Sequence, residues 1–463
     1  MFCTCKALIT LSVLAILVLY LGLYKAKNAL LPVTLFGLGA ALVLSILEWN
    51  SGAAPIYSGM MLFDNFAVAF TSICIVSTML ILLISKDYFE HISEHVAEYY
   101  TIILFALIGI LVMVSFHNLS MLFIGIEIMS VSLYILAGIR KHDFKSNEAA
   151  LKYFLMGAFS TGFLLLGIAF LYGASGSFDL GAIKEYVISN PSGISPLFYS
   201  GVTLMIIGLS FKIGAAPFHF WTPDVYEGSP TLITAFMSTV VKTAGFAAFL
   251  RLFMVCFAPL HDFWMPSLLV ISVLTLFIGN VTALYQHSFK RMLAFSSISH
   301  AGYMLFAIVA LGPLSGNSVF VYASAYSIAS IIAFAVLILV KRQTGSDNFE
   351  SFNGLARKNP FIAFTLTVAM LSLAGIPLTA GFIGKFMMFS TALSEYHLVM
   401  VILAVVNAVI GIFYYLKVIV AMYFKSAERN ELESSPYFNF VLGFSALLTI
   451  LVGVYPGFIS NLF

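Results

Sequence analysis

Charged residues are scarce in this sequence. Asp, Glu, Lys and Arg together make up 9% of the 463 residues, and 61% of the residues are hydrophobic, whereas a soluble globular domain typically carries about 25% charged residues. This composition excludes a water-soluble fold and makes lipid the solvent of most of the chain. Because the formal net charge is only +2, the charge balance gives no reason to expect a nucleic-acid partner or an acidic substrate.

Motifs that hold metals, nucleotides or redox cofactors are also missing. The four cysteines, Cys3, Cys5, Cys74 and Cys256, lack the spacing of metal ligands, so we interpret them as ordinary small apolar residues. The sequence contains no Gly-rich phosphate loop, no histidine pair spaced for a metal and no nucleophile elbow. We therefore expect this chain to bind no cofactor of its own.

Long apolar segments, in contrast, recur along nearly the whole chain. A helix that crosses the bilayer needs about 20 mostly apolar residues, and only short polar gaps separate the segments of this length. The sequence therefore predicts an all-α polytopic membrane protein, a single domain over residues 1–463, with about fourteen transmembrane helices. The predicted spans are 7–24, 29–47, 63–84, 100–116, 119–139, 150–173, 200–220, 231–256, 264–284, 291–310, 319–340, 361–394, 398–424 and 437–457.

The basic residues are distributed unevenly between the two sides of these spans. Short cytoplasmic loops carry the excess of Lys and Arg in membrane proteins. With the N-terminus outside, three basic residues fall on the outer side, namely Lys6, Lys184 and Arg251. Fourteen fall on the inner side, which supports an even number of spans: Lys25, Lys27, Lys86, Arg140, Lys141, Lys145, Lys290, Arg291, Lys341, Arg342, Arg357, Lys358, Lys425 and Arg429.

Four ionisable residues lie within predicted spans, too far from either end to reach water easily. Glu127 is in the fifth span, Lys212 in the seventh, Lys242 in the eighth and Lys385 in the twelfth. Each such charge costs about 2.5–3.5 kcal/mol on insertion scales, so these residues are functional candidates by default. A purely structural ion pair would explain one lysine, but a single buried acid matches three lysines poorly.

Lysine has a property that suits proton transfer. Its compact ammonium group gives up its proton when it is desolvated, whereas arginine stays charged. A carboxylate about 4 Å away stabilises the charged form by about 4 kcal/mol at an effective dielectric constant of 20. Our hypothesis is that Glu127 and Lys212 form a switch, in which separation of the pair releases a proton.

Two predicted spans are interrupted by proline near these lysines. Pro217 follows Lys212 by five residues, and Pro377 precedes Lys385 by eight. Proline removes a helix hydrogen bond, and broken helices at corresponding places in two halves are typical of transport sites; two ordinary proline kinks are the alternative. Spans seven and twelve stand five apart, which predicts an inverted repeat of spans four to eight in spans nine to thirteen. The helices then group as 7–99, 100–256, 264–424 and 437–457.

Polar residues near the breaks are further candidates. Under the predicted repeat, the tenth span corresponds to the fifth, and His300 occupies the position that Glu127 occupies there. His300 would either relay protons near neutral pH or simply join two helices by hydrogen bonds. His219, Asp224 and Glu227 follow the first break and should lie at the inner surface. They would either gather protons at a channel mouth or form a solvated helix-capping loop.

Five motifs around these residues strongly resemble the antiporter-like subunits of respiratory complex I and of the related multisubunit cation/proton antiporters. The resemblance covers nearly the whole chain and is strongest to the N subunits of bacterial NADH–quinone oxidoreductase, because WTPDVYEGSP is quite specific to them and the M subunits carry a glutamate where this chain has Lys385. The motifs are GIEIMS, SFKIGAAPFHFWTPDVYEGSP, VVKTAGF, KRMLAFSSISHAGY and MLSLAGIPLTAGFIGKF.

The resemblance implies roles for the four membrane-embedded residues. Glu127 is similar to the family's glutamate on the fifth span, Lys212 to its channel lysine, Lys242 to the connecting lysine and Lys385 to the lysine on the exit side. It also implies a proton-translocating subunit of NADH–quinone oxidoreductase in the bacterial inner membrane, with lipids and the M, K and J membrane subunits as partners. NADH and quinone would be used by other subunits. The alternatives are a subunit of a cation/proton antiporter and a non-pumping structural subunit.

Overall fold

Helices fill the part of the chain that the structure describes. The computed structural model describes residues 5–51, 54–89, 96–191, 193–395, 398–426 and 431–457, so Cys3 and Arg429 lie outside it. Within these ranges β-structure is confined to isolated bridges. The elements are α1 (Lys6–Leu23), α2 (Lys27–Ile46), α3 (Asn65–Leu83), α4 (Ser85–Phe89), α5 (Val96–Val114), α6 (Leu119–Ala137), α7 (Phe144–Ser175), α8 (Leu180–Ser189), α9 (Pro196–Ile213), α10 (Trp221–Gly228), α11 (Thr231–Phe236), the π-helical turn η1 (Met237–Val241), α12 (Lys242–Val255), η2 (Ala258–Leu260), α13 (His261–Leu284), α14 (Phe289–Ala310), α15 (Ser315–Thr344), η3 (Phe349–Phe352), α16 (Leu355–Lys358), α17 (Pro360–Ala374), α18 (Ala380–Ser394), α19 (Leu398–Phe424) and α20 (Pro436–Val454).

The predicted spans are confirmed, with some shifted ends. In the described part, thirteen helices are long and apolar enough to cross a membrane, and the twelfth predicted span is the shorter pair α17 and α18. Helix α7 begins at Phe144 rather than at residue 150, and α9 ends at Ile213 rather than at residue 220. The loop expected between the sixth and seventh spans contains the short amphipathic helix α8.

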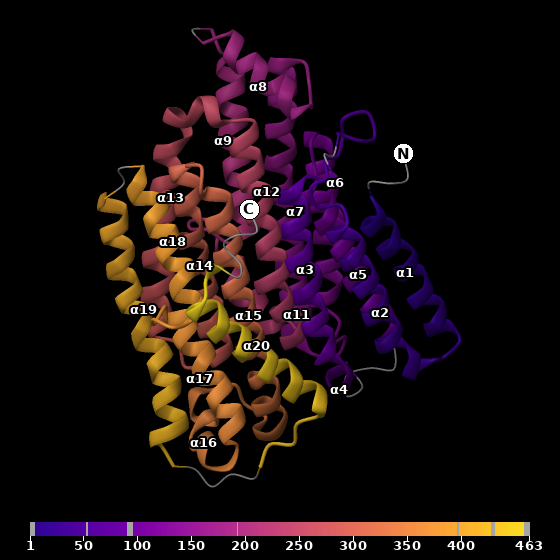
Figure 1. Ribbon diagram of the computed structural model, residues 1–463, viewed down its shortest axis with the longest axis vertical. Coiled ribbons are helices and arrows are strands. Elements are labelled where there is room, and N and C mark those ends of the chain that lie inside the picture. Colours follow the sequence, from indigo (N-terminus) through magenta and orange to yellow (C-terminus); the bar gives the residue numbers. More distant parts are fainter. Residues whose placement is uncertain are drawn as a thin grey trace.

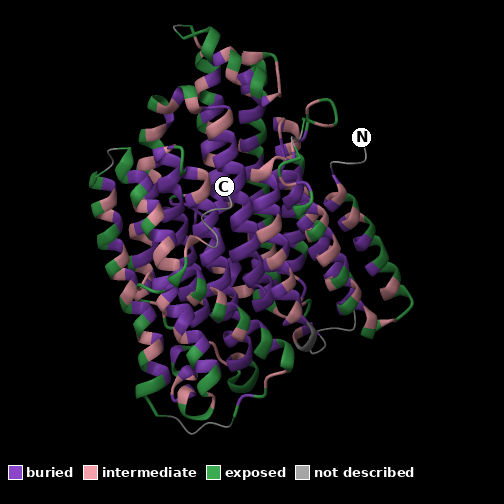
Figure 2. Ribbon diagram, in the orientation of Figure 1, coloured by how far each residue is buried: buried purple, intermediate pink, exposed green. Residues whose placement is uncertain are grey.

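The burial of the helices shows where the centre of the molecule lies. The most apolar windows of Thr231–Val255, Phe289–Ala310 and Ser315–Thr344 are completely buried by other helices, whereas about a third or less of the windows in α1 and α2 is buried. Figure 2 shows this gradient, with buried residues along the axis and exposed residues on the flanks. Lys242 and His300 lie on these central helices, so other helices separate them from lipid.

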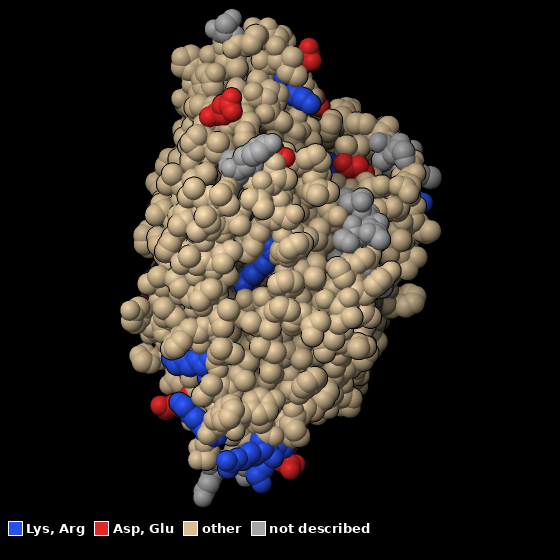
Figure 3. All heavy atoms as spheres, turned by 60° about the vertical axis from the view of Figure 1, so that its left-hand side comes forward, with Lys and Arg blue, Asp and Glu red and all other residues tan. Residues whose placement is uncertain are grey.

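The distribution of charged residues on the surface is the one expected of a protein that spans a membrane. Figure 3 shows a flank that is largely free of charge, with Lys and Arg gathered at its lower end. Helices α8 and α9 begin at the upper end in Figure 1, whereas α16 and α17 begin at the lower end. Since α9 and α17 are the first halves of the two broken spans, the spans run in opposite directions, as the inverted repeat predicts.

Both breaks are built by the same backbone motif. Helix α9 is followed by Gly214 at φ +72° and α17 by Gly375 at φ +81°, a left-handed conformation that glycine adopts without steric cost. The next amide in each case donates to a carbonyl five residues earlier: Ala215 to Ser210 (2.9 Å) and Ile376 to Leu371 (3.0 Å). This bond satisfies an otherwise unpaired helix carbonyl, so each helix ends cleanly inside the protein.

Glycine also sets the spacing of corresponding helix pairs. A Cβ on Gly109 of α5 would lie 2.6 Å from the Met129 amide of α6, and one on Gly279 of α13 would lie 2.6 Å from the Ser299 amide of α14. Small residues allow membrane helices to approach closely. Helices α6 and α14 are thus held against their neighbours in the same way, and they carry Glu127 and His300.

Candidate functional site

Lys212 is held between the hydroxyl groups of two neighbouring helices. It lies in the last turn of α9, and its Nζ donates to Ser130 Oγ of α6 at 2.9 Å and to Thr161 Oγ1 of α7 at 3.3 Å. Glu127 lies one turn before Ser130 on α6, within electrostatic range of the lysine. Its buried Oε1 atom has no hydrogen-bond partner among the described residues. The structure therefore shows Glu127 and Lys212 as near neighbours whose charges are not in direct contact.

Lys242 is buried at the centre of the molecule. Its side chain is 3% exposed, and its Nζ donates to the backbone carbonyl of Ser297 at 2.6 Å and to the hydroxyl of the same residue. The residue directly follows the π-helical turn η1, which interrupts the regular helix. Such π-bulges are frequent at functional sites, and nothing in the sequence indicated this one.

His300 lies between two tyrosine hydroxyl groups. Its Nδ1 is 2.7 Å from the Tyr322 hydroxyl and its Nε2 is 3.0 Å from the Tyr415 hydroxyl. A neutral imidazole has one donor and one acceptor nitrogen, and either tautomer fits because a hydroxyl takes both roles. His300 is also within electrostatic range of both Lys242 and Lys385. Both lysines therefore lie near His300.

Lys385 reaches back to the helix that precedes its own break. Its Nζ donates to the carbonyls of Leu373 (3.0 Å) and Ala374 (2.8 Å) at the end of α17, and it lies 5.1 Å from the ring centroid of Tyr303. The C-terminus of a helix stabilises a cation by about 0.3–1 kcal/mol. The backbone of the second break is thus the immediate partner of this lysine.

A small cavity connects His300 with the second break. Its volume is about 10 Å³, and Tyr322, Ser372 and Gly381 are among the residues that line it. That volume holds about one water-sized sphere. Only a small space, lined by His300 and Tyr322 and by Ser372 and Leu373 of α17, therefore separates the histidine from the second break.

Asp224 and Glu227 lie at the inner end, as expected, but on a helix and not in a loop. Asp224 belongs to helix α10 rather than to a loop, and it pairs with Lys152 (2.9 Å) and Arg291 (3.2 Å). Burial raises the pKa of the Asp224 carboxyl, but the two cations outweigh this effect and hold the pKa below its usual value. Glu227 pairs with Arg291 as well. His219 is only 6% exposed and lies inside the break rather than at the surface.

Two buried basic residues were counted in the sequence analysis only as residues at the ends of spans. Lys290 is 1% exposed and donates to the carbonyls of Glu227 (3.0 Å) and Ser229 (2.5 Å) at the end of α10. Arg251 is 4% exposed and pairs with Asp64, which caps α3. Both fix one helix to another near the two ends of the molecule.

Known proteins that resemble this chain have the same fold. The model of the family described as NADH:quinone oxidoreductase/Mrp antiporter, TM, matches residues 116–411. The chain is 41% identical to an NADH-quinone oxidoreductase subunit N from Cytophaga hutchinsonii over 97% of this chain and 98% of the relative. Among solved structures it matches respiratory complex I from Thermus thermophilus with a TM-score of 0.84, 33% identity and 98% of each chain covered. The Mrp complex of a Dietzia species shares the fold, with a TM-score of 0.89, 17% identity and coverage of 100% of this chain and 96% of the other.

Fold and site together define the class to which the protein belongs. It is an antiporter-like membrane subunit of the NADH:quinone oxidoreductase/Mrp antiporter family. The full-length relatives then place the chain, within that family, with subunit N of NADH-quinone oxidoreductase, or respiratory complex I, as a multi-pass protein of the bacterial inner membrane.

Proposed function

We propose that the chain translocates protons along a row of buried and half-buried residues that runs from Glu127 through Lys212, Lys242 and His300 to Lys385. One observation carries this proposal: among the described residues, each of the three lysines is bound only by neutral acceptors. Lys212 donates to hydroxyls, Lys242 to a carbonyl and a hydroxyl, and Lys385 to carbonyls. Such acceptors also suit a neutral amine, so loss of the proton leaves the hydrogen bonds in place.

Several other cations show the contrast. Lys152, Arg251 and Lys341 each pair with a carboxylate, which locks the positive charge. Lys290 is buried among carbonyls, but it lies near the inner end of α14, where it holds the end of α10. Lys212, Lys242 and Lys385 therefore differ from these cations in having no carboxylate partner among the described residues, and they lie within the membrane-spanning part, where a transported proton would pass.

His300 and the tyrosines supply the link between Lys242 and Lys385. A proton that arrives at one imidazole nitrogen releases the proton on the other, and both nitrogens face hydroxyl groups. Tyr415 also contacts the hydroxyl of Ser296, one residue before the Ser297 that binds Lys242. This arrangement favours the relay interpretation of His300, although the same bonds also join three helices.

The inner ion-pair network is the proposed mouth of the pathway. Lys145, Lys152, Asp224, Glu227 and Arg291 border a hollow of about 110 Å³ at the inner end. A group of exposed carboxylates and amines exchanges protons rapidly with water, and His219 lies between this network and Lys212 in the sequence. The alternative, a solvated helix-capping loop, does not describe Asp224, because it lies inside α10, which has no side-chain cap hydrogen bond at its N-terminus.

We further propose that quinone reduction in other subunits drives this movement through neighbouring membrane subunits, such as M, K and J, and that NADH and quinone bind elsewhere in the complex. The names of the relatives and of the Thermus thermophilus structure support this assignment. The shared fold of the Mrp complex keeps a cation/proton antiporter as the second candidate. That candidate predicts proton movement driven by a sodium gradient without any electron donor.

Replacement of Lys242 by methionine tests the proposal. Methionine keeps the length and apolar stem of the side chain but binds no proton, so we expect proton uptake by vesicles containing the assembled complex to fall by about tenfold or more. A pH-sensitive dye measures the uptake after addition of NADH and quinone. The matched control is Lys358→Gln, which removes an exposed cation at the inner surface and should leave uptake unchanged. Full uptake by an assembled Lys242→Met complex would refute the relay.

A further inference from the structure

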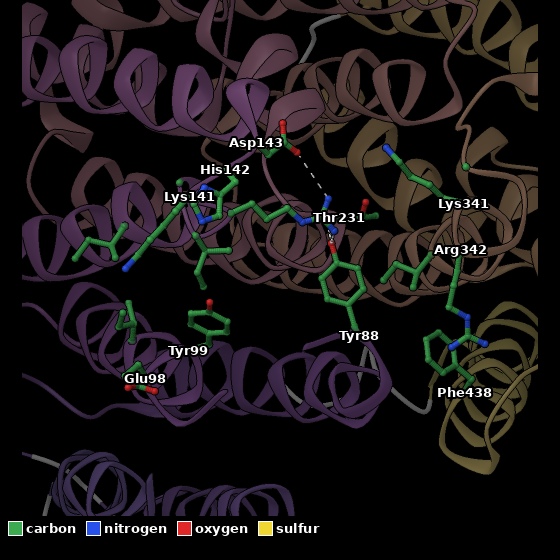
Figure 4. A pocket seen from close by; sticks show the side chains of 17 residues that line it. Tyr88, Glu98, Tyr99, Lys141, His142, Asp143, Thr231, Lys341, Arg342 and Phe438 are labelled. Atoms are coloured by element: carbon green, nitrogen blue, oxygen red, sulfur yellow. Dashed lines mark hydrogen bonds and ion pairs between the residues drawn. The ribbon is translucent and has the colours of Figure 1, made fainter. Parts of the chain in front are cut away.

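A large cavity opens at the inner end of the protein, away from the row of lysines. Its volume is about 1170 Å³, and it lies between the start of α5, the connection from α6 to α7, the last turns of α15 and the start of α20. Figure 4 shows Lys141 and Glu98 on one side of the cavity and Lys341 and Arg342 on the other. Nothing in the proposed proton pathway uses this space.

The cavity is predominantly basic. Arg140 and Lys141 come from the α6–α7 connection, and Lys341 and Arg342 come from the last turns of α15, whereas the described residues that line it include two carboxylates, Glu98 and Asp143. The Lys141 ammonium is exposed and has no ion pair or hydrogen bond with the described residues.

Two of the other cations remain close to the cavity despite partners of their own. Arg140 donates to the Tyr88 hydroxyl at 3.1 Å and lies 3.9 Å from Asp143. Arg342 donates to the backbone carbonyl of Glu433 and has no ion pair with the part of the chain that the structure describes. An anion inside the cavity would lie between the two groups of cations and be attracted by both.

The rest of the lining includes several apolar side chains. Ile102 of α5, Ile135 of α6 and Ile338 of α15 face the cavity, together with Phe438 of α20. Ile135 is 53% exposed, so the apolar lining continues onto the outer surface of α6, which faces lipid. A small water-soluble anion would make no favourable contact with these apolar side chains.

We propose that this cavity binds an anionic phospholipid, with its phosphate among Arg140, Lys141 and Arg342 and an acyl chain along Ile102 and Ile135. Basic pockets between transmembrane helices on the cytoplasmic side are suited to such head groups, and each Lys or Arg near the surface contributes about 1 kcal/mol to their attraction. The excess of basic residues assigns this end of the molecule to the cytoplasmic side. The lipid would join the α6–α7 connection of the first repeat to α15 of the second.

Lipid binding to the purified complex tests this site. The delipidated complex is titrated with long-chain phosphatidylglycerol, with phosphatidylethanolamine and with glycerol phosphate, and bound lipid is counted by native mass spectrometry. Relative to the wild type, we expect the affinity for phosphatidylglycerol to fall about fivefold in Lys141→Gln and about thirtyfold in Lys141→Gln/Arg342→Gln, a loss of about 1 kcal/mol per charge. Lys141→Arg should retain the affinity, and the control Lys358→Gln should match the wild type.

The other outcomes would overturn the proposal. Equal binding of phosphatidylethanolamine would show that the basic residues select no anionic head group. Displacement of the lipid by equimolar glycerol phosphate would identify a site for a soluble anion. Loss of a protein subunit from the Lys141→Gln complex, with lipid binding unchanged, would identify an acidic protein segment as the occupant.

Discussion

Replacement of Lys212 by methionine is expected to reduce proton pumping by about a hundredfold. Without the amine, a proton crossing this part of the membrane is an unsolvated charge, whose cost of about 2.5–3.5 kcal/mol adds to the barrier. Methionine fills nearly the same volume, so the helices should remain packed. The measurement is the initial rate of proton uptake by vesicles that contain the assembled complex.

A second variant at the same position separates proton release from charge alone. Arginine keeps the positive charge and donates to the same hydroxyls, but it does not release its proton. We therefore expect Lys212→Arg to pump as poorly as Lys212→Met, whereas Ser130→Ala, which removes only one acceptor, should retain most of the activity. Normal pumping by Lys212→Arg would show that the residue acts by its charge and not by proton exchange.

Replacement of Gly375 by valine should have the largest effect on stability. Its φ of +81° disfavours every residue with a Cβ, and a Cβ there would lie 2.7 Å from Lys385 Cδ. The left-handed backbone costs about 1–2 kcal/mol and overpacking about 1–3 kcal/mol more. We therefore expect a loss of about 2–5 kcal/mol and displacement of Lys385, measured as a lower thermal midpoint of the purified complex and reduced pumping.

Gly39 in α2 provides the matched control, because a Cβ at this position meets no atom within 4 Å. Gly39→Val should leave both the thermal midpoint and pumping close to wild type. Gly375→Asn should fall between the two, since asparagine tolerates the left-handed conformation better. If Gly375→Val assembled with an unchanged midpoint, the break would not depend on this backbone conformation.

The sequence predicted the elements of the fold well, because each follows from local composition. Apolar length located the spans, and Pro217 and Pro377 located the two breaks. The left-handed glycines, Gly214 and Gly375, precede these prolines by only two or three residues and were therefore within the predicted regions. Helix α8 was missed because its ten residues lack the apolar length of a membrane span.

The partners of the buried lysines were not predictable in the same way. Lys212 binds Ser130, which is 82 residues away in the sequence, and Lys242 binds Ser297, which is 55 residues away. Serine and threonine are common in membrane helices, so no local pattern distinguishes the ones that bind a lysine. Tyr322 and Tyr415 likewise resemble ordinary packing aromatics until the fold brings them to His300.

The structure also shows how Glu127 and Lys212, the two residues of the proposed switch, are arranged. The sequence suggested direct contact between Glu127 and Lys212, whereas Ser130 and Thr161 bind the lysine and Oε1 of Glu127 lacks a partner among the described residues. This arrangement corresponds to the state of the proposed switch in which Glu127 and Lys212 are separated. A short movement of either side chain along α6 would bring the two charges together and favour proton uptake by the lysine.

The central claim is that buried lysines change their proton occupancy during turnover, and infrared difference spectroscopy tests it most directly. The complex is prepared with ¹⁵N-lysine, and spectra are recorded before and after reduction by NADH in the wild type and in Lys242→Met. We predict ammonium bands that shift with the isotope in the wild type and are diminished in the variant. Difference spectra without any isotope-sensitive lysine band, in a complex that pumps at the normal rate, would contradict the claim.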